Sequence, residues 1–209
     1  ITLDDGLKSQ YDCALPILEK YNIKAFWFVF TSVFRNKIDF NEYCNYLIFK
    51  NFKNKKDEFC RDFIKKTKLN NKIFKTKNFN NYLKYNKKYC SFYSNDEIRY
   101  RFVRNFILSK NEFKKQITKY FNLKKYDFVK AKSLWMNIKH LKKINKLGHT
   151  IGMHSDTHSL KFHKLSFREQ KKEYSNCYKF IQKLTKQKPL SMSHPLGSYN
   201  ANTLKILRK

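Results

Sequence analysis

The chain has 209 residues, of which 41% are hydrophobic and 17% aromatic, so it is long and apolar enough to fold around a sizeable core. Lys and Arg outnumber Asp and Glu by 46 to 16, which gives a formal net charge of +30. The basic residues are 39 Lys and only 7 Arg, although Arg is the better bidentate partner for phosphate, so the charge alone does not indicate a nucleic-acid-binding protein. No apolar run approaches the roughly 18 residues of a membrane-spanning helix, which excludes a transmembrane segment.

The N-terminal residues predict a strand, a helix and a second strand. Residues 1–3 are a short strand that ends in an Asp-Asp-Gly turn, and apolar residues at helical spacing follow in residues 14–21. Residues 23–30 contain an unbroken apolar run, which is typical of a strand covered on both faces in a parallel sheet. These elements together make a β-α unit.

Residues from about 35 to 130 interrupt this alternation. They are rich in Lys, Asn, Phe and Tyr and contain several stretches of helical periodicity, so we expect a large, mainly helical insertion. The insertion carries 26 basic and 9 acidic residues, against 20 and 7 in the rest of the chain, so the positive charge is not confined to one patch. We interpret residues 1–209 as one domain that contains this insertion.

From about residue 133 the alternation of helices and strands returns. The expected elements, in chain order, are a helix at 134–144, a strand at 150–153, a helix at 166–184, a strand at 190–194 and a final helix. This pattern indicates a parallel sheet, either open or closed into a barrel. Because the first residues lie within a strand and the last within an apolar-periodic helix, we expect both ends of the domain to be cut.

The cysteines indicate whether the protein works in a reducing or an oxidising cellular compartment. The chain has five, an odd number, and no pair has CxxC spacing, which argues against a disulfide framework or a zinc ribbon. No signal peptide is visible, although the true N-terminus is expected to be missing. These features favour a reducing compartment and therefore a cytoplasmic location.

His154 and His158 give the strongest chemical signal in the sequence. Imidazoles at positions i and i+4 of a helical turn have Cβ atoms about 5–6 Å apart, so both can reach one metal ion, although this spacing alone is as often structural. The second signal is Asp4 and Asp5 before Gly6, where the chain can turn so that one carboxylate binds a metal and the other acts beside it as a base. Alone, this pattern is more often only a turn.

Together the two motifs are typical of a catalytic metal site. Two histidines and one aspartate leave coordination positions open, as in catalytic rather than structural zinc sites. A second carboxylate beside them supplies a general base for water. Both motifs follow apolar strands, where the active site of a parallel α/β barrel lies. Because the ligands mix nitrogen and oxygen, the expected cofactor is one divalent ion, Zn²⁺.

Three segments match, in order, the motifs of one known family. Residues 2–6 read T-L-D-D-G, against T-F-D-D-G, and residues 148–158 read G-H-T-I-G-M-H-S-D-T-H, against G-H-E-I-x-x-H-[ST]-x-x-H. Residues 193–197, S-H-P-L-G, lie where R-x-P-Y or Y-P-Y-G is expected. The chain thus resembles the polysaccharide deacetylases with a NodB homology domain, carbohydrate esterase family 4, over about residues 1–30 and 134–209. The resemblance implies a distorted (β/α) barrel of NodB type that carries the insertion.

The resemblance also implies a role for each matched residue. In the family, the first Asp of motif one is the catalytic base and the second binds the metal; these positions are Asp4 and Asp5 here. Both histidines of motif two bind the metal, which points to His154 and His158. The Tyr of motif three donates its backbone N–H to the oxyanion, and a backbone donor survives its replacement by Leu196.

The chain departs from the family pattern in three ways. Ser193 replaces the Arg that orients the base. The fourth and fifth motifs, including the His that acts as general acid, would lie beyond Lys209, so the acid has no candidate. A long insertion at 35–130 separates the first two motifs; because it follows a strand, we expect it to overhang the metal site and shape its mouth.

The sequence therefore predicts a metal-dependent hydrolase that removes acetyl groups from N-acetylated sugars of a polysaccharide or glycan precursor. His194, at the expected mouth of the site, is a candidate substrate contact, whereas His149 is expected to be structural. The aromatic residues of the insertion are expected to form mainly its own core rather than a sugar-stacking surface. Two alternatives stay open: a non-catalytic carbohydrate-binding member, since the motif-three Arg is missing, and a basic nucleic-acid binder, for which no motif is visible.

Overall fold

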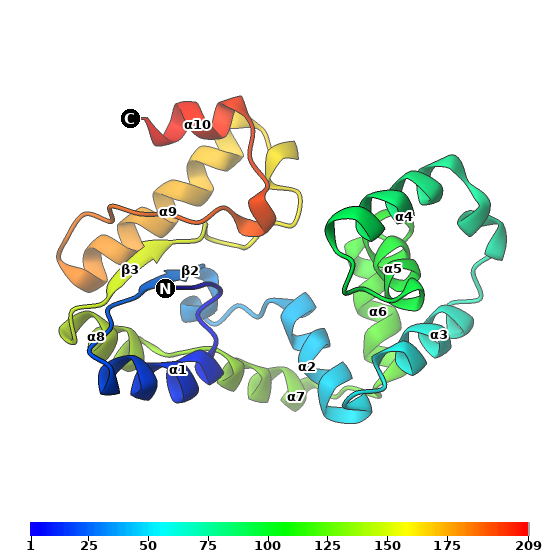
Figure 1. The fold of residues 1–209 in the computed structure, drawn as a ribbon, viewed down its shortest axis with the longest axis horizontal. Helices are drawn as coiled ribbons and strands as arrows, with labels where there is room; N and C mark the ends of the chain where they lie inside the picture. The colour runs from blue at the N-terminus through cyan, green and yellow to red at the C-terminus, as the bar shows by residue number, and fades with distance from the viewer. Residues whose placement is uncertain (209) are drawn as a thin grey trace. The chain divides into compact units, whose positions relative to one another are not determined.

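A computed structural model describes residues 1–208, apart from the side chains of Lys125 and Tyr126 (Figure 1). The chain divides into two units, one formed by Ile1–Asp39 with the chain from Phe128 onward and the other by Phe40–Asp127. The first unit contains strands β1 (Thr2–Leu3), β2 (Phe26–Val29) and β3 (Thr150–Met153) and helices α1 (Lys8–Lys20), α8 (Ile138–Lys146), α9 (Phe167–Thr185) and α10 (Ala201–Leu207). The second contains α2 (Phe40–Phe52), α3 (Lys56–Lys66), α4 (Lys77–Tyr89), α5 (Asn95–Phe102) and α6 (Lys110–Tyr120), and α7 (Lys125–Ala131) runs across the boundary.

The three strands form one parallel sheet in the order β1–β2–β3. At its carboxyl end, Met153 of β3 lies opposite Val29 of β2. Because all three strands are parallel, their carboxyl ends lie at the same edge, where Asp4 follows β1 and His154 follows β3. The predicted α/β fold with parallel strands is therefore confirmed.

The predicted strand at residues 190–194 is reduced to a single parallel bridge. Met192 pairs with Met153, and the bridge is flanked by hydrogen bonds from Met153 N–H to the Ser191 carbonyl (3.0 Å) and from Ser193 N–H to the Met153 carbonyl (2.9 Å). Prolines three residues before and after Met192 lack the N–H that a longer ladder needs. The segment thus adds one parallel bridge to the three strands, and the described part of the chain shows a three-stranded parallel sheet rather than a closed barrel.

The core of the first unit joins this sheet to helices α1, α8 and α9. Figure 1 shows β2 and β3 between α9 on one side and α1 with α8 on the other. The buried residues of this core include Trp27 and Val29 of β2, Ile151 and Met153 of β3, Leu15 and Leu18 of α1, Leu141 and Ile144 of α8, and Cys177 and Ile181 of α9. Each fully buried aliphatic side chain contributes about 1.5–3 kcal/mol to folding, so this packing holds the strand ends in place.

The second unit folds around aromatic clusters of its own. The larger cluster contains Cys44 and Ile48 of α2, Phe59, Cys60 and Phe63 of α3, Tyr100 of α5, and Phe113 and Ile117 of α6. A smaller cluster contains Phe79 of α4 with Ile98 and Phe102 of α5. These buried aromatic residues form a core, as we expected for most of them. Across residues 1–208, no helix has both the length and the apolar character needed to cross a bilayer.

The packing of α8 on the sheet can be tested with one substitution. Ile144→Ala should lower the free energy of unfolding by about 2–5 kcal/mol, because it leaves a cavity where the side chain is completely buried. The control is Ile17→Ala, on α1 at a position that is 58% exposed, which should change the free energy of unfolding by less than about 1 kcal/mol. Tryptophan fluorescence during denaturation follows this unit alone, because Trp27 and Trp135 both belong to it. Equal effects of the two substitutions would contradict this core.

Candidate metal centre and active site

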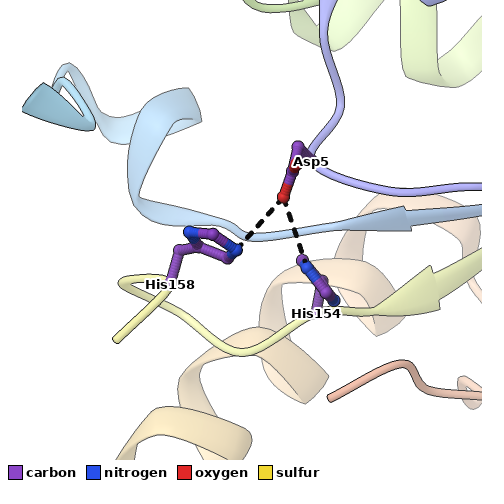
Figure 2. A group of neighbouring side chains, drawn as sticks. All are labelled: Asp5, His154 and His158. Carbon is purple, nitrogen blue, oxygen red and sulfur yellow. Dashed lines mark ion pairs between the residues drawn. The ribbon is translucent and has the colours of Figure 1, made fainter. Parts of the chain in front are cut away.

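The structure brings Asp5, His154 and His158 together beyond the carboxyl end of the sheet (Figure 2). Nε2 of His154 and Nε2 of His158 lie 3.3 and 3.2 Å from the same atom, Oδ1 of Asp5. Ligands that hold a zinc ion tetrahedrally at about 2.0–2.1 Å lie about 3.3 Å from one another, so the spacing of these atoms suits a single ion. The three side chains therefore have the geometry of a metal site.

The turn after β1 places the two aspartates. Asp5 and Gly6 both adopt the left-handed region, with φ of 74° and 66°, which turns the chain sharply at the end of the strand. The Gln10 side-chain amide donates to the carbonyl of Asp4 (2.7 Å), and the N–H of Met136 donates to the carbonyl of Gly6 (2.9 Å). These bonds hold the turn from both sides, so Asp5 is presented toward the histidines.

The orientation of His154 is fixed by backbone groups. Its N–H donates to the carbonyl of Val29 (3.1 Å), and its Nδ1 lies 2.9 Å from the carbonyl oxygen of Ser193. Because a carbonyl oxygen only accepts, Nδ1 carries the ring proton and Nε2 keeps its lone pair. That lone pair is directed toward Asp5, as metal ligation requires.

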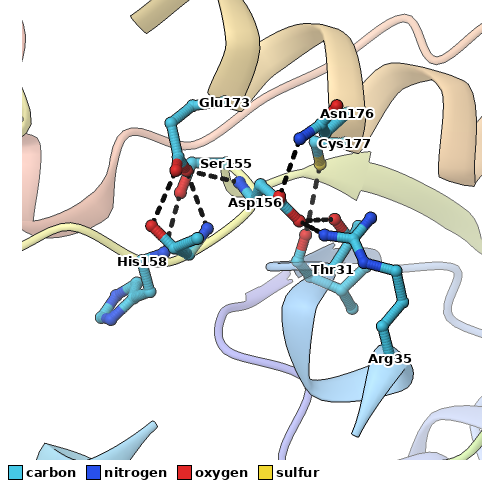
Figure 3. Close-up of polar contacts among 10 residues, drawn as sticks. Thr31, Arg35, Ser155, Asp156, His158, Glu173, Asn176 and Cys177 are labelled. Atoms are coloured by element: carbon cyan, nitrogen blue, oxygen red, sulfur yellow. Dashed lines mark hydrogen bonds and ion pairs between the residues drawn. The ribbon is translucent and has the colours of Figure 1, made fainter. Parts of the chain in front are cut away.

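His158 lies in a loop that is anchored through the buried carboxylate of Asp156 (Figure 3). Oδ1 of Asp156 accepts from the hydroxyl of Thr31 (2.6 Å) and pairs with Arg35, and Oδ2 accepts from the side-chain amide of Asn176 (3.0 Å). Asp156 thereby ties the histidine loop to the segment that follows β2 and to α9.

Glu173 of α9 anchors the same loop from its other side (Figure 3). Its carboxylate accepts from the N–H of Asp156 (3.0 Å), the N–H of Thr157 (2.7 Å) and the hydroxyl of Thr157 (2.7 Å). The N–H of His158 donates to the hydroxyl of Ser155 (3.2 Å). Glu173 thus accepts hydrogen bonds from the loop, while Asp156 accepts them from neighbouring segments, and together the two carboxylates hold His158 in place.

The charge states of the cluster also suit a cation. Burial raises the pKa of Asp5, but the neighbouring His154 and His158 outweigh it, so the pKa lies below its ordinary value and the carboxylate is ionised. Burial lowers the pKa of His158 and outweighs the opposite effect of Asp5, and His154 adds to the lowering, so the imidazole is neutral at pH 7. Among the described residues, the buried Oδ1 of Asp5 has no hydrogen-bond partner. A divalent cation would satisfy this oxygen and the two imidazole lone pairs together.

Asp4 lies next to this cluster and has a different environment. Its Oδ2 accepts a hydrogen bond from the hydroxyl of Ser193 (3.0 Å), the residue at the position of the family's motif-three Arg. Asp4, Asp5 and His154 therefore follow strand ends at one edge of the sheet, and His158 lies in the loop after β3.

The remaining two candidate residues, His194 and Leu196, lie in the segment after the Met192 bridge. His194 hydrogen-bonds through Nδ1 to the hydroxyl of Tyr174 (3.0 Å) and stacks on Tyr199 with ring centroids 4.7 Å apart. Burial, with a smaller contribution from His154, lowers the pKa of His194. Leu196 has a left-handed φ of 54°, and within residues 1–208 its N–H donates to no backbone carbonyl.

Sequence reasoning identified His149 as structural, and the structure shows why. Nδ1 of His149 accepts from the N–H of Ala25 (3.1 Å), so Nε2 carries the proton and donates to Glu19 (3.1 Å). The sequence did not predict the roles of Asp156 and Glu173, because a buried carboxylate that anchors a distant loop leaves no pattern in the sequence. The one available signal was the position of Asp156 between the two histidines of the H-x-x-x-H motif.

Part of the chain matches a known protein family. Residues 107–209, which include His154 and His158, match the family model described as polysaccharide deacetylase. The chain belongs to the polysaccharide deacetylase family. No curated protein sequence matches this family member.

Solved structures of deacetylases share the fold. One is the Streptococcus pyogenes deacetylase PplD in complex with acetate, with 15% identity and a TM-score of 0.51 over 99% of this chain and 50% of that one. Another is a de-N-acetylase from Aggregatibacter actinomycetemcomitans, with 14% identity and a TM-score of 0.51 over 99% of this chain and 58% of that one. The chain thus spans about half the length of these structures, and at this identity the likeness concerns the fold.

The role of Asp156 in this polysaccharide deacetylase family member can be measured by its stability. Asp156→Ala should lower the free energy of unfolding by about 1–3 kcal/mol, because the partners of a buried carboxylate lose their acceptor. Asp12→Ala is the matched control, since Asp12 pairs with Lys8 at the exposed surface of α1, and it should have little effect. If both substitutions changed the denaturation midpoint equally, the anchoring role of Asp156 would be wrong.

Proposed function

We propose that this protein is a metal-dependent hydrolase that removes acetyl groups from N-acetylated sugars of a polysaccharide or glycan precursor. The observation that carries the proposal is the cluster of Asp5, His154 and His158 with a second carboxylate, Asp4, beside it at one sheet edge. Family membership and the fold of known deacetylases support it, and one structure with this fold holds acetate, the product that such a reaction releases.

We also propose that the parallel sheet is part of a distorted (β/α) barrel of NodB type. The strands follow one another in the order β1–β2–β3, each joined by a crossover, and the Met192 bridge continues the sheet beside β3. In such barrels the residues after the strands line the active site. Asp4, Asp5 and His154 occupy those positions.

A divalent ion, Zn²⁺ by its preference for mixed nitrogen and oxygen ligands, would be held by Asp5, His154 and His158. Both the buried Oδ1 of Asp5, which accepts no hydrogen bond within residues 1–208, and the tautomer that Ser193 imposes on His154 fit this assignment. When bound, the ion supplies Lewis acidity toward the acetyl carbonyl and lowers the pKa of a water molecule. Proton transfer and stabilisation of the oxyanion would be carried out by residues of the chain.

Asp4 would act as the general base. Its Oδ2 is occupied by the Ser193 hydroxyl, which leaves Oδ1 to accept the proton of the attacking water. The N–H of Leu196, which donates to no backbone carbonyl within residues 1–208, would donate to the oxyanion of the tetrahedral intermediate. The general acid that protonates the leaving amine is not assigned to any residue of this chain.

An N-acetylated sugar is the substrate that we favour over an O-acetyl ester. Tyr199, 51% exposed and stacked on His194, offers an aromatic ring in the same segment as Leu196. The flat face of such a ring packs against the apolar face of a sugar. His194 would thus contact substrate through the ring pair rather than through the metal.

The metal assignment predicts the metal content of single variants. Wild-type protein prepared with Zn²⁺ and no chelator should hold one ion per chain. The single variants Asp5→Asn, His154→Ala and His158→Ala should each lose most of this zinc, because two remaining protein ligands are too few to hold the ion. His163→Ala is the control, since His163 is exposed and bonds to Ser198, and it should keep the ion. Elemental analysis provides the measurement, and equal metal content in all variants would refute the assignment.

The two carboxylates should separate in their effects. Asp4→Asn should keep the metal but lower kcat by about 10²–10⁴-fold, because a general base contributes about this much. Acetate release from a soluble oligomer of N-acetylglucosamine is the measurement, with metal content determined in parallel. An Asp4→Asn protein without metal would mean that the carboxylates are reversed. Wild-type protein that binds the oligomer with metal present but releases no acetate would instead support the non-catalytic carbohydrate-binding alternative.

A further inference from the structure

Ser193 uses all three of its polar groups at the candidate site. Its N–H donates to the carbonyl of Met153 at the end of β3 (2.9 Å). Its carbonyl accepts from Nδ1 of His154 (2.9 Å), and its hydroxyl donates to Oδ2 of Asp4 (3.0 Å). One residue therefore contacts the strand end, a candidate metal ligand and the candidate base.

The position of Ser193 is set by its backbone. The parallel bridge between Met192 and Met153 immediately precedes it, and the buried Pro195, with its fixed φ, follows two residues later. A serine side chain has a single rotatable bond between this backbone and the hydroxyl, so the hydroxyl has few alternative positions. The backbone thus fixes the position of the Ser193 hydroxyl that donates to Asp4, and a short side chain adds little freedom.

We propose that Ser193 is a positioning residue that orients the Asp4 carboxylate relative to the metal ligands, in place of the arginine expected at this position. Its hydroxyl holds Oδ2 of Asp4, and its carbonyl holds the ring of His154, so base and ligand are aligned through one backbone segment. This inference rests on the proposed function, because it assigns Asp4 the role of general base.

The two contacts predict different consequences of losing the side chain. Removing the hydroxyl frees Asp4 but leaves the carbonyl that orients His154, so metal binding should not change. Asp4 would then sample several rotamers, and only some of them point its free oxygen toward the attacking water. The loss should therefore appear in kcat and not in KM or in metal content.

The test compares three single variants and one double variant of the zinc-loaded chain. Ser193→Ala removes the hydroxyl, and Ser193→Thr restores it with a side chain that suits an extended backbone. Ser191→Ala is the matched control, because Ser191 lies two residues earlier in the same segment and its buried hydroxyl has no hydrogen-bond partner in the part of the chain that the structure describes. Asp4→Asn/Ser193→Ala tests whether Ser193 acts through Asp4.

With a soluble N-acetylglucosamine oligomer as substrate, Ser193→Ala should lower kcat by about 10- to 100-fold, as expected for a lost hydrogen bond to a charged group, with KM unchanged. Ser193→Thr and Ser191→Ala should stay within about threefold of wild type. The double variant should be no slower than Asp4→Asn alone, because without the base there is nothing left to orient. An equal loss in Ser193→Thr, or additive losses in the double variant, would overturn the inference.

A second readout does not depend on activity. In crystal structures of the zinc-loaded proteins, Asp4 should occupy one rotamer in wild type and in Ser193→Thr, but more than one in Ser193→Ala, with His154 unmoved. An Asp4 side chain that keeps its position in Ser193→Ala would overturn the positioning role. If wild-type protein released no acetate, the proposed function would fail, and the rotamer of Asp4 would still decide separately whether Ser193 holds it.

Discussion

Parallel pairing of β1, β2 and β3 is the constraint on which the candidate site depends. Asp5 and His154 are far apart in the sequence, and they meet because the strands before them end at the same edge of one sheet. Ser193 joins them because the Met192 bridge places its segment beside β3. The core between the sheet and helices α1, α8 and α9 fixes these strand ends, so the chemistry of the site rests on packing that contains none of its residues.

Backbone strain is concentrated where the candidate residues lie. Within residues 1–208, ten non-glycine residues have a positive φ, and six of them, Asn22, Asn36, Lys53, Lys68, Asn122 and Lys186, follow the ends of helices, where this conformation is common. The other four are Asp5, Ser155, His158 and Leu196, all in the loops of the site. Such conformations cost of order 1–3 kcal/mol each and persist only where surrounding contacts impose them. The bonds of Asp156 and Glu173 supply those contacts for the histidine loop.

The sequence predicted the elements whose residues carry a strong local pattern. The apolar run before Thr31 and the strand before His154 are present as β2 and β3, and the histidine spacing pointed to the residues that lie around Asp5. The strand at 190–194 was predicted too long, because apolar alternation does not reveal how much of a segment finds a pairing partner. That the long insertion overhangs the site stays a prediction.

Contacts between residues distant in sequence were the part that could not be predicted. Asp156 reads as a turn residue between two histidines, yet its partners Thr31, Arg35 and Asn176 come from two other segments. Ser193 first reads as the loss of an arginine, and only the structure shows that its hydroxyl bonds to Asp4. Both depend on tertiary geometry, because a hydrogen bond between distant side chains imposes no spacing on the sequence.

The proposed chemistry depends on one metal ion bound by Asp5, His154 and His158. The most direct measurement is a crystal structure of protein supplied with Zn²⁺, with anomalous diffraction recorded at the zinc edge. One strong anomalous peak is expected at about 2.0–2.2 Å from Oδ1 of Asp5, Nε2 of His154 and Nε2 of His158. A peak at other residues only, or no peak near these three atoms when the protein is saturated with zinc, would contradict it.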